Sequence, residues 1–169
     1  APEQFIPYTA EELNYNAANA GQNRIALWPN RPLPVSDDMG IVYFGKILVG
    51  NGFLNYTNLG VGVAYVREGQ MVADRPKADV IFGPNEPHFV GSMIHEGYIY
   101  AYGSMAGSSD TLVARVPVNA AVNRSSYKFW NGSKWVSELS KAAPMVGGKN
   151  LPAASYWNPY AKRFLSIEI

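Results

Sequence analysis

The sequence predicts an all-β protein. Aromatic and β-branched residues are frequent, with eleven Tyr, seven Phe and four Trp, while sixteen Gly and twelve Pro supply turns. Short apolar runs alternate with segments rich in Gly, Pro, Asn and Asp, as strands and turns do. Similar apolar runs also recur roughly 60 residues apart, at Ile41–Gly45, Ile99–Gly103 and Phe164–Ile167, which indicates a repeated unit.

Composition excludes several classes of function. The formal net charge is +1 and no block of like charges occurs, so neither nucleic acid nor a charged membrane surface is a predicted partner. No apolar run reaches the roughly 18 residues of a membrane span. The absence of Cys excludes disulfides, thiolate zinc sites and a thiol nucleophile. With only His88 and His95 available, a His-rich metal site is excluded, and we predict no metal site and no cofactor. A calcium ion held by carboxylates and carbonyls is the alternative, although no EF-hand pattern supports it.

The leading segment, residues 1–23, contains one predicted helix. Thr9 and Glu12 have the spacing of a capping box, in which each side chain bonds the backbone N–H of the other residue. We therefore expect a short helix over residues 10–18, ended by Asn19-Ala20-Gly21.

Residues 24–83 form the first predicted blade-like unit. Its expected strands are residues 24–29, 40–49, 60–66 and 78–82. A Pro-rich segment with two adjacent carboxylates, Asp37 and Asp38, lies between the first two strands and is typical of a turn.

Residues 84–150 form the second predicted unit, and residues 151–169 begin a third. The expected strands are residues 88–94, 98–102, 111–116, 127–130, 134–136, 154–158 and 163–169. His95-Glu96-Gly97 is the predicted turn between the first two of these strands. Asn131-Gly132, between two aromatic runs, is the strongest hairpin signal in the chain.

Four antiparallel strands per unit describe a β-propeller blade, so we predict a partial propeller of about two to three blades. A β-sandwich of short strands is the alternative. An incomplete propeller would expose strand edges, which invites aggregation. We therefore expect a second chain or a homo-oligomer to complete the fold.

The order of these runs resembles a known family. The residues on which this resemblance depends are Arg24–Pro29, Gly40–Lys46, Gly60–Ala64, Gly97–Gly103, Leu112–Pro117, Tyr127–Gly132 with Trp135, and Tyr156–Tyr160. In this order they resemble secreted five-bladed β-propellers related to endo-D-arabinanases, a glycoside-hydrolase-like family that was formerly a domain of unknown function. The resemblance implies a five-bladed propeller that hydrolyses glycans. The first blade, where such enzymes usually place a catalytic acid, and the closing blades have no counterpart here.

Three N-x-[ST] sequons favour an extracellular glycoprotein. Asn55, Asn123 and Asn131 each lie in a polar, turn-like context, although chance can also produce such tripeptides. The chain begins at Ala1 without an initiator Met, as a processed secreted chain would. We expect a secreted protein that carries glycans at these positions.

The candidate catalytic residues are Glu86 and His88, at the entry of a predicted strand. Glycoside hydrolysis needs two carboxyl groups roughly 5 to 9.5 Å apart. Glu86, held between Pro84 and Pro87, is the best candidate acid or base, although a solvated loop position is the simpler interpretation. Asp37 and Asp38 could supply the second carboxylate, but turn residues commonly have this composition.

Aromatic residues are the candidate substrate-binding groups. Trp130, Trp135 and Tyr156 could stack on the apolar faces of sugar rings, or could instead fill gaps between sheets. For Trp28 and Trp157, within strand patterns, packing is favoured. The predicted function is hydrolysis of a carbohydrate ligand. A lectin-like glycan-binding protein without a catalytic acid pair is the alternative, and a purely structural module is third.

Overall fold

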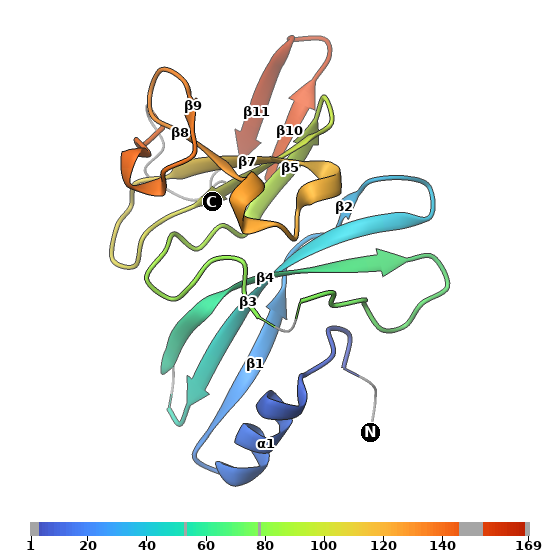
Figure 1. The fold of residues 1–169 in the computed structure, drawn as a ribbon, viewed down its shortest axis with the longest axis vertical. Coiled ribbons are helices and arrows are strands. Elements are labelled where there is room, and N and C mark those ends of the chain that lie inside the picture. Colours follow the sequence, from blue (N-terminus) through green and yellow to red (C-terminus); the bar gives the residue numbers. More distant parts are fainter. Residues whose placement is uncertain (1–3, 53, 78, 146–153, 168–169) are drawn as a thin grey trace. The chain divides into compact units, whose positions relative to one another are not determined.

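The computed structural model describes residues 4–52, 54–77, 79–145 and 154–167. Its regular structure consists mostly of antiparallel strands, which confirms the all-β prediction (Figure 1). The chain divides into two compact units, Ala1–Pro84 and Asn85–Ile169. Both a partial propeller and a sandwich remain consistent with these antiparallel sheets. Among the described residues no helix has the length and apolar character needed to cross a membrane.

Helix α1 (Ala10–Ala18) forms where its capping box predicts it. The Thr9 hydroxyl accepts the Glu12 N–H at 3.2 Å, and Glu12 Oε2 accepts the Thr9 N–H at 2.9 Å. Two of the N–H groups that a helix start leaves without intrahelical partners are thereby satisfied. The helix ends at Asn19, whose side-chain amide donates to the Tyr15 carbonyl at 2.8 Å.

A long central strand organises the sheet of the first unit. Strand β3 (Met39–Gly50) pairs along one side with β1 (Asn23–Pro29) and β2 (Leu33–Pro34), and along the other with β4 (Tyr56–Arg67). The predicted strands at residues 24–29, 40–49 and 60–66 are therefore confirmed. The two-residue strand β2 lies in the segment that the sequence predicted to be only a turn.

The predicted strand at residues 78–82 is wrong for the residues that the structure describes. Only a single bridge forms there, between Phe82 and Val61 on the outer edge of β4. The side chain of Asp79 accepts the Val80 N–H at 2.8 Å, so this donor is diverted from a strand ladder. Ala78 lies outside the described residues.

The sheet of the first unit is buried on both faces, with Ile41, Tyr43 and Val63 on one of them. One core cluster lies on the other face, against Phe5, Tyr8 and Tyr15. Its buried members are Ile6, Ile25, Leu27, Val42, Phe44, Ala64 and Ala73. The Phe44 ring packs on Gly62 so closely that an added Cβ would lie 2.2 Å from Phe44 Cζ. A glycine is therefore required on β4 opposite this ring.

The second unit contains a five-stranded antiparallel meander followed by a hairpin (Figure 1). The meander consists of β5 (Gly91–His95), β6 (Tyr98–Gly103), β7 (Leu112–Pro117), β8 (Lys128–Trp130) and β9 (Trp135–Val136). The hairpin consists of β10 (Ala154–Asn158) and β11 (Arg163–Ile167). Three 3-10 turns complete the unit: η1 (Val118–Ala120), η2 (Arg124–Ser126) and η3 (Leu139–Lys141).

Local turn chemistry explains both predicted hairpins of the meander. Glu96 and Gly97 join β5 to β6 with φ angles of 48° and 78°, the positive values that a tight two-residue turn requires. Between β8 and β9, Asn131 Oδ1 accepts the N–H groups of Ser133 and Lys134 at 3.1 and 2.9 Å. The first strand begins at Gly91, three residues later than predicted, although the Val90 N–H still bonds the Tyr102 carbonyl.

The two faces of the meander differ in character. The buried face carries Ile99, Ala101, Ala114, Val116 and Phe129, each fully enclosed. The strand register places a second set on the opposite face, which we call the aromatic face: Tyr98, Tyr100, Arg115, Lys128, Trp130 and Trp135. Except for the exposed Lys128, these side chains are half-buried. Tyr100, Trp130 and Trp135 pack against three buried residues of the same face, Met93, Tyr102 and Val113.

Candidate functional site

The loop that carries Glu86 and His88 is attached to the adjoining strand by its backbone. The His88 N–H donates to the Ser104 carbonyl at 3.0 Å, just beyond the end of β6. Gly103 makes this close approach feasible, because a Cβ there would lie 2.7 Å from His88 C, His88 O and Phe89 N. Phe89 is fully buried and fixes the end of the loop in the core of the second unit.

Glu86 is half-buried and forms an ion pair with Arg124. Its Oε1 lies 2.5 Å from Arg124 Nη2, and the two side chains are 29% and 36% exposed. The Arg124 guanidinium carbon lies 5.1 Å from the centre of the Phe129 ring, within cation–π distance. Nothing in the sequence indicated Arg124, which follows Glu86 by 38 residues and reaches it only through the fold.

Hydrogen bonds fix the conformation of the segment that carries Arg124. The Asn123 side chain caps η2 by accepting the Ser125 N–H at 3.2 Å. The buried Tyr127 hydroxyl then donates to the Ala121 carbonyl at 2.6 Å, which closes the segment around η2. The orientation of the Glu86 carboxylate therefore depends on packed structure rather than on a flexible loop.

His88 is half-buried, and its Nε2 has no hydrogen-bond partner among the described residues. Burial lowers the pKa of this imidazole, because the apolar surroundings disfavour the charged form. At neutral pH the ring is therefore neutral. A neutral imidazole can exchange hydrogen bonds with hydroxyl groups, although it carries no charge with which to balance Glu86.

The structure places no second carboxylate beside Glu86 within the described part of the second unit. The other described acids of this unit, Glu96, Asp110 and Glu138, are all exposed. In the first unit, Asp37 and Asp38 occupy an exposed turn that the Val35 N–H closes on the Met39 carbonyl at 2.9 Å. These two residues thus have the turn role that was the simpler interpretation.

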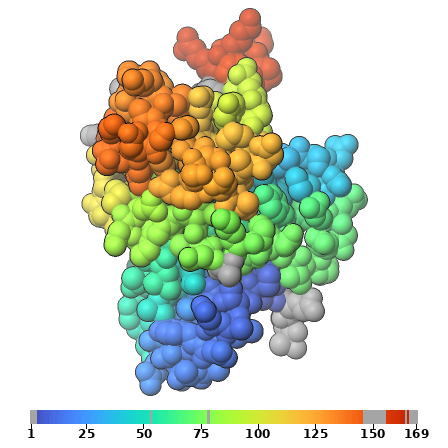
Figure 2. Space-filling model, in the orientation of Figure 1, coloured from blue at the N-terminus to red at the C-terminus, as the bar shows by residue number. Residues whose placement is uncertain are grey.

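The predicted aromatic groups form one packed cluster and one separate position. Trp130 and Trp135 lie 5.4 Å apart between ring centres, and Tyr100 packs against Trp135 at 5.9 Å. The hairpin that carries both tryptophans, orange in Figure 2, lies at the molecular surface.

Tyr156, on β10, is 47% exposed. Its neighbour Trp157 is half-buried and packs against His95, with ring centres 4.5 Å apart, in agreement with a packing role.

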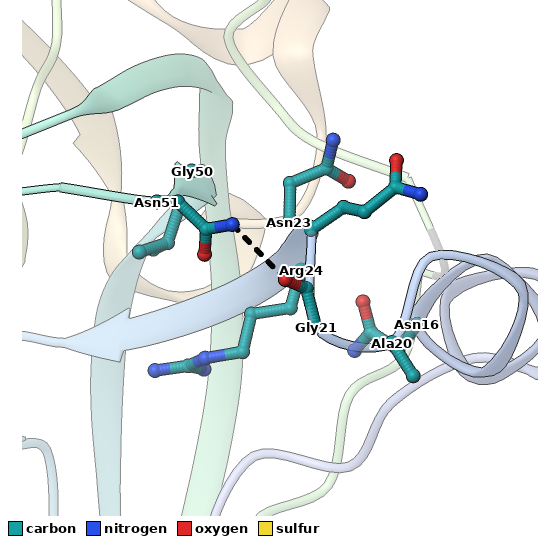
Figure 3. Close-up of a pocket in the computed structure, with 9 residues that line it drawn as sticks. Asn16, Ala20, Gly21, Asn23, Arg24, Gly50 and Asn51 are labelled. Atoms are coloured by element: carbon teal, nitrogen blue, oxygen red, sulfur yellow. Dashed lines mark hydrogen bonds between the residues drawn. The ribbon is translucent and has the colours of Figure 1, made fainter.

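A hollow of about 300 Å³ lies in the first unit, between the end of α1, the start of β1 and the end of β3 (Figure 3). The asparagine side chains of its wall are already used within the protein. Asn16 bonds both the N–H and the carbonyl of Ile25, and Asn51 donates to the Gly21 carbonyl at 3.0 Å. The hollow therefore offers a ligand few polar side chains beyond Gln22 and Arg24.

The first unit contains a buried ion cluster that the sequence did not predict. Glu12 is only 1% exposed, yet its carboxylate bonds Arg75 through both oxygens, at 2.7 and 3.0 Å, and Lys46 at 2.8 Å. Arg75 also lies over the Phe44 ring at 5.1 Å. The sequence did not indicate that Glu12 forms ion pairs, because the capping box accounts for this residue without any distant partner. The cluster joins α1, β3 and the segment after β4, so we assign it to folding rather than to chemistry.

The three sequon asparagines occupy different environments. Asn55 and Asn123 are exposed, whereas Asn131 is half-buried and its Oδ1 accepts bonds from Ser133 and Lys134. Among the described residues no group of three or more His, Cys, Asp or Glu is arranged to hold a metal ion.

Comparison with known proteins shows no family membership. No family model matches the sequence, and no curated protein matches it. Among solved structures, one similar chain is the crystal structure of a putative hydrolase from Bacteroides ovatus, with a TM-score of 0.47 and 15% sequence identity. The match covers 75% of this chain and 32% of that chain, so this chain spans about a third of that protein's length.

Proposed function

We propose that this chain belongs to a secreted carbohydrate-active protein of the glycoside hydrolase type, with Glu86 as a catalytic carboxylate. The observation that carries the proposal is the half-buried Glu86 carboxylate, held 2.5 Å from Arg124. Hydrolysis of a glycoside needs a carboxylate of fixed orientation facing the anomeric carbon or its attacking water. Arg124 fixes the orientation of the Glu86 carboxylate. Experiment then decides whether Glu86 acts as base, nucleophile or acid.

His88 and the aromatic residues fit binding roles around this carboxylate. We propose that the neutral His88 imidazole bonds a substrate hydroxyl, since burial lowers its pKa and removes its charge. Trp130, Trp135 and Tyr156 would stack on sugar rings, because each presents part of its ring to solvent. The second carboxylate of a hydrolase would come from elsewhere in the assembled protein.

Replacement of Glu86 with Gln tests the catalytic role. We expect turnover of the best substrate in a panel of neutral and charged glycans to fall at least about 100-fold, because the amide retains the shape but cannot act as base or nucleophile. Binding of the same glycan should change by less than about threefold. The matched control is Glu96→Gln, which removes one charge from the exposed β5–β6 turn and should leave turnover unchanged. Equal turnover in Glu86→Gln and unmodified protein would refute the assignment.

A lectin-like function is the second candidate, and the exposure of every other described acid in the second unit favours it. A binding protein needs the aromatic face but no carboxyl pair. Measurable binding of a glycan without turnover in the unmodified protein would support the lectin-like function and refute the hydrolase function. In that case Trp135→Ala should weaken binding, with a loss of about tenfold or more for one stacked ring.

We also propose that the protein carries glycans and associates with a second chain or with copies of itself. The exposed Asn55 and Asn123 would accept glycans more readily than the half-buried Asn131. From a secreting eukaryotic host, the native mass should exceed the 18.5 kDa of the chain, and glycosidase treatment should remove part of the excess. Light scattering with mass spectrometry measures both. A monomer of 18.5 kDa would contradict both proposals.

A further inference from the structure

Two cations lie directly opposite each other on the aromatic face. The register of β7 and β8 pairs Arg115 with Lys128, so their side chains leave the sheet on the same side. Like charges in this position destabilise a sheet. Among the described residues neither cation forms an ion pair with a carboxylate, and the Lys128 ammonium donates only to the Ser137 hydroxyl, at 2.6 Å. The pair is thus an arrangement that folding alone does not favour.

Arg115 is also held in a defined position. Its guanidinium carbon lies 4.4 Å from the centre of the Trp135 ring and 4.8 Å from that of Tyr98. Its Nε is buried and has no hydrogen-bond partner in the described part of the chain. A guanidinium held by cation–π contacts can still bind a planar anion through its terminal Nη donors. The rings therefore position this cation before any ligand arrives.

The surroundings add a surface for a flat partner. Trp135 packs against both Trp130 and Tyr100, and all three rings are half-buried rather than enclosed. An array of partly exposed rings beside two cations combines the two contacts that an acidic saccharide offers, an apolar ring face and a carboxylate or sulfate. A neutral glycan would use only the first of these and would leave both charges uncompensated.

We propose that the aromatic face binds an acidic saccharide, with Arg115 and Lys128 contacting its carboxylate or sulfate group. This inference rests on the proposed carbohydrate-active function and names its ligand class. The charge comes from the ligand because the sheet itself places no described carboxylate beside the two cations. Either a uronic acid or a sulfated sugar supplies the same contact.

Calorimetric titration of the whole chain with four defined probes tests the proposal. The probes are an oligogalacturonate, its methyl ester, a sulfated oligosaccharide and its desulfated form. We expect at least one charged probe to bind ten times or more tightly than its neutral form, with an affinity that falls as salt rises. Arg115→Gln and Lys128→Gln should each remove most of that preference. Lys134→Gln, an equal charge change in the neighbouring exposed turn, should alter the affinity by less than twofold.

The outcomes separate this inference from the function on which it rests. Equal binding of charged and neutral probes, or an unaltered preference in both variants, would overturn the acidic ligand but leave a carbohydrate function standing. Failure of all four probes and of the wider glycan panel would overturn both. If Arg115→Gln does not fold, as circular dichroism would show, Lys128→Gln still tests the proposal, because its side chain is exposed and its replacement should not disturb the fold.

Discussion

Glu12→Ala is expected to lower the free energy of unfolding of the first unit by about 3–5 kcal/mol, the usual cost of removing one partner of a buried ion pair. The side chain of Arg75 is 3% exposed and bonds both oxygens of Glu12. Its charge would stay buried without its partner, and the capping bond to the Thr9 N–H would also be lost. Equilibrium unfolding in denaturant, followed by hydrogen exchange at α1 and β3, measures the effect.

The control for this substitution lies one residue away. Glu11→Ala removes an exposed carboxylate from the same helical turn and should change stability by less than about 0.5 kcal/mol. A paired Glu12→Leu and Arg75→Met variant should recover part of the loss, because it removes the buried carboxylate and the buried guanidinium together and leaves only the partly exposed Lys46 ammonium. A loss under about 1 kcal/mol in Glu12→Ala would show that the cluster does not hold the unit together.

Acid should act on the same cluster. Burial raises the pKa of Glu12, but hydrogen bonds from Arg75, Lys46 and the Thr9 backbone outweigh it and bring the pKa from 4.5 to about 2. A folded-state pKa below the unfolded value stabilises the fold fully above about pH 4.5. This stabilisation, of order 3 kcal/mol, is lost as the pH falls towards 2. Unfolding at pH 7, 4 and 3 should show the loss in the unmodified protein, and a smaller loss in Glu12→Gln.

Gly103→Ala is expected to destabilise the second unit by about 3 kcal/mol, at the upper end of the overpacking range. The added Cβ would meet three backbone atoms of His88 and Phe89 at 2.7 Å, and backbone cannot rotate aside as a side chain can. Relief requires the loop that carries Glu86 to move away from β6. We therefore expect faster hydrogen exchange at His88 and Val90, whose N–H groups bond Ser104 and Tyr102.

Ser104→Ala is the matched comparison for Gly103→Ala. It places the same side chain at the next position and retains the backbone carbonyl that accepts the His88 N–H. Its effect on unfolding should stay within about 0.5 kcal/mol. Similar unfolding curves for the two variants would show that the contact between β6 and the loop is not tight, and that Glu86 is positioned by other means.

The elements that the sequence predicted correctly are those with local causes. Helix α1 follows from Thr9 and Glu12, three residues apart. The two hairpin turns follow from Gly97, which tolerates positive φ, and from Asn131, which bonds its own backbone. The strands of the meander follow from their apolar runs. The segment at residues 78–82 was mispredicted because Asp79 diverts a donor from the ladder, a competition that an apolar pattern does not reveal.

What the sequence by itself determined is therefore the all-β class, helix α1, most strands and Glu86 as a polar residue at a strand entry. Only the tertiary structure decided which charges meet. Arg124 reaches Glu86, Arg75 and Lys46 enclose Glu12, and Arg115 lies opposite Lys128. The physical reason is that local pattern reflects backbone hydrogen bonding and burial within a few residues. A contact between charges far apart in the chain depends instead on strand register and packing, which no short window of sequence contains.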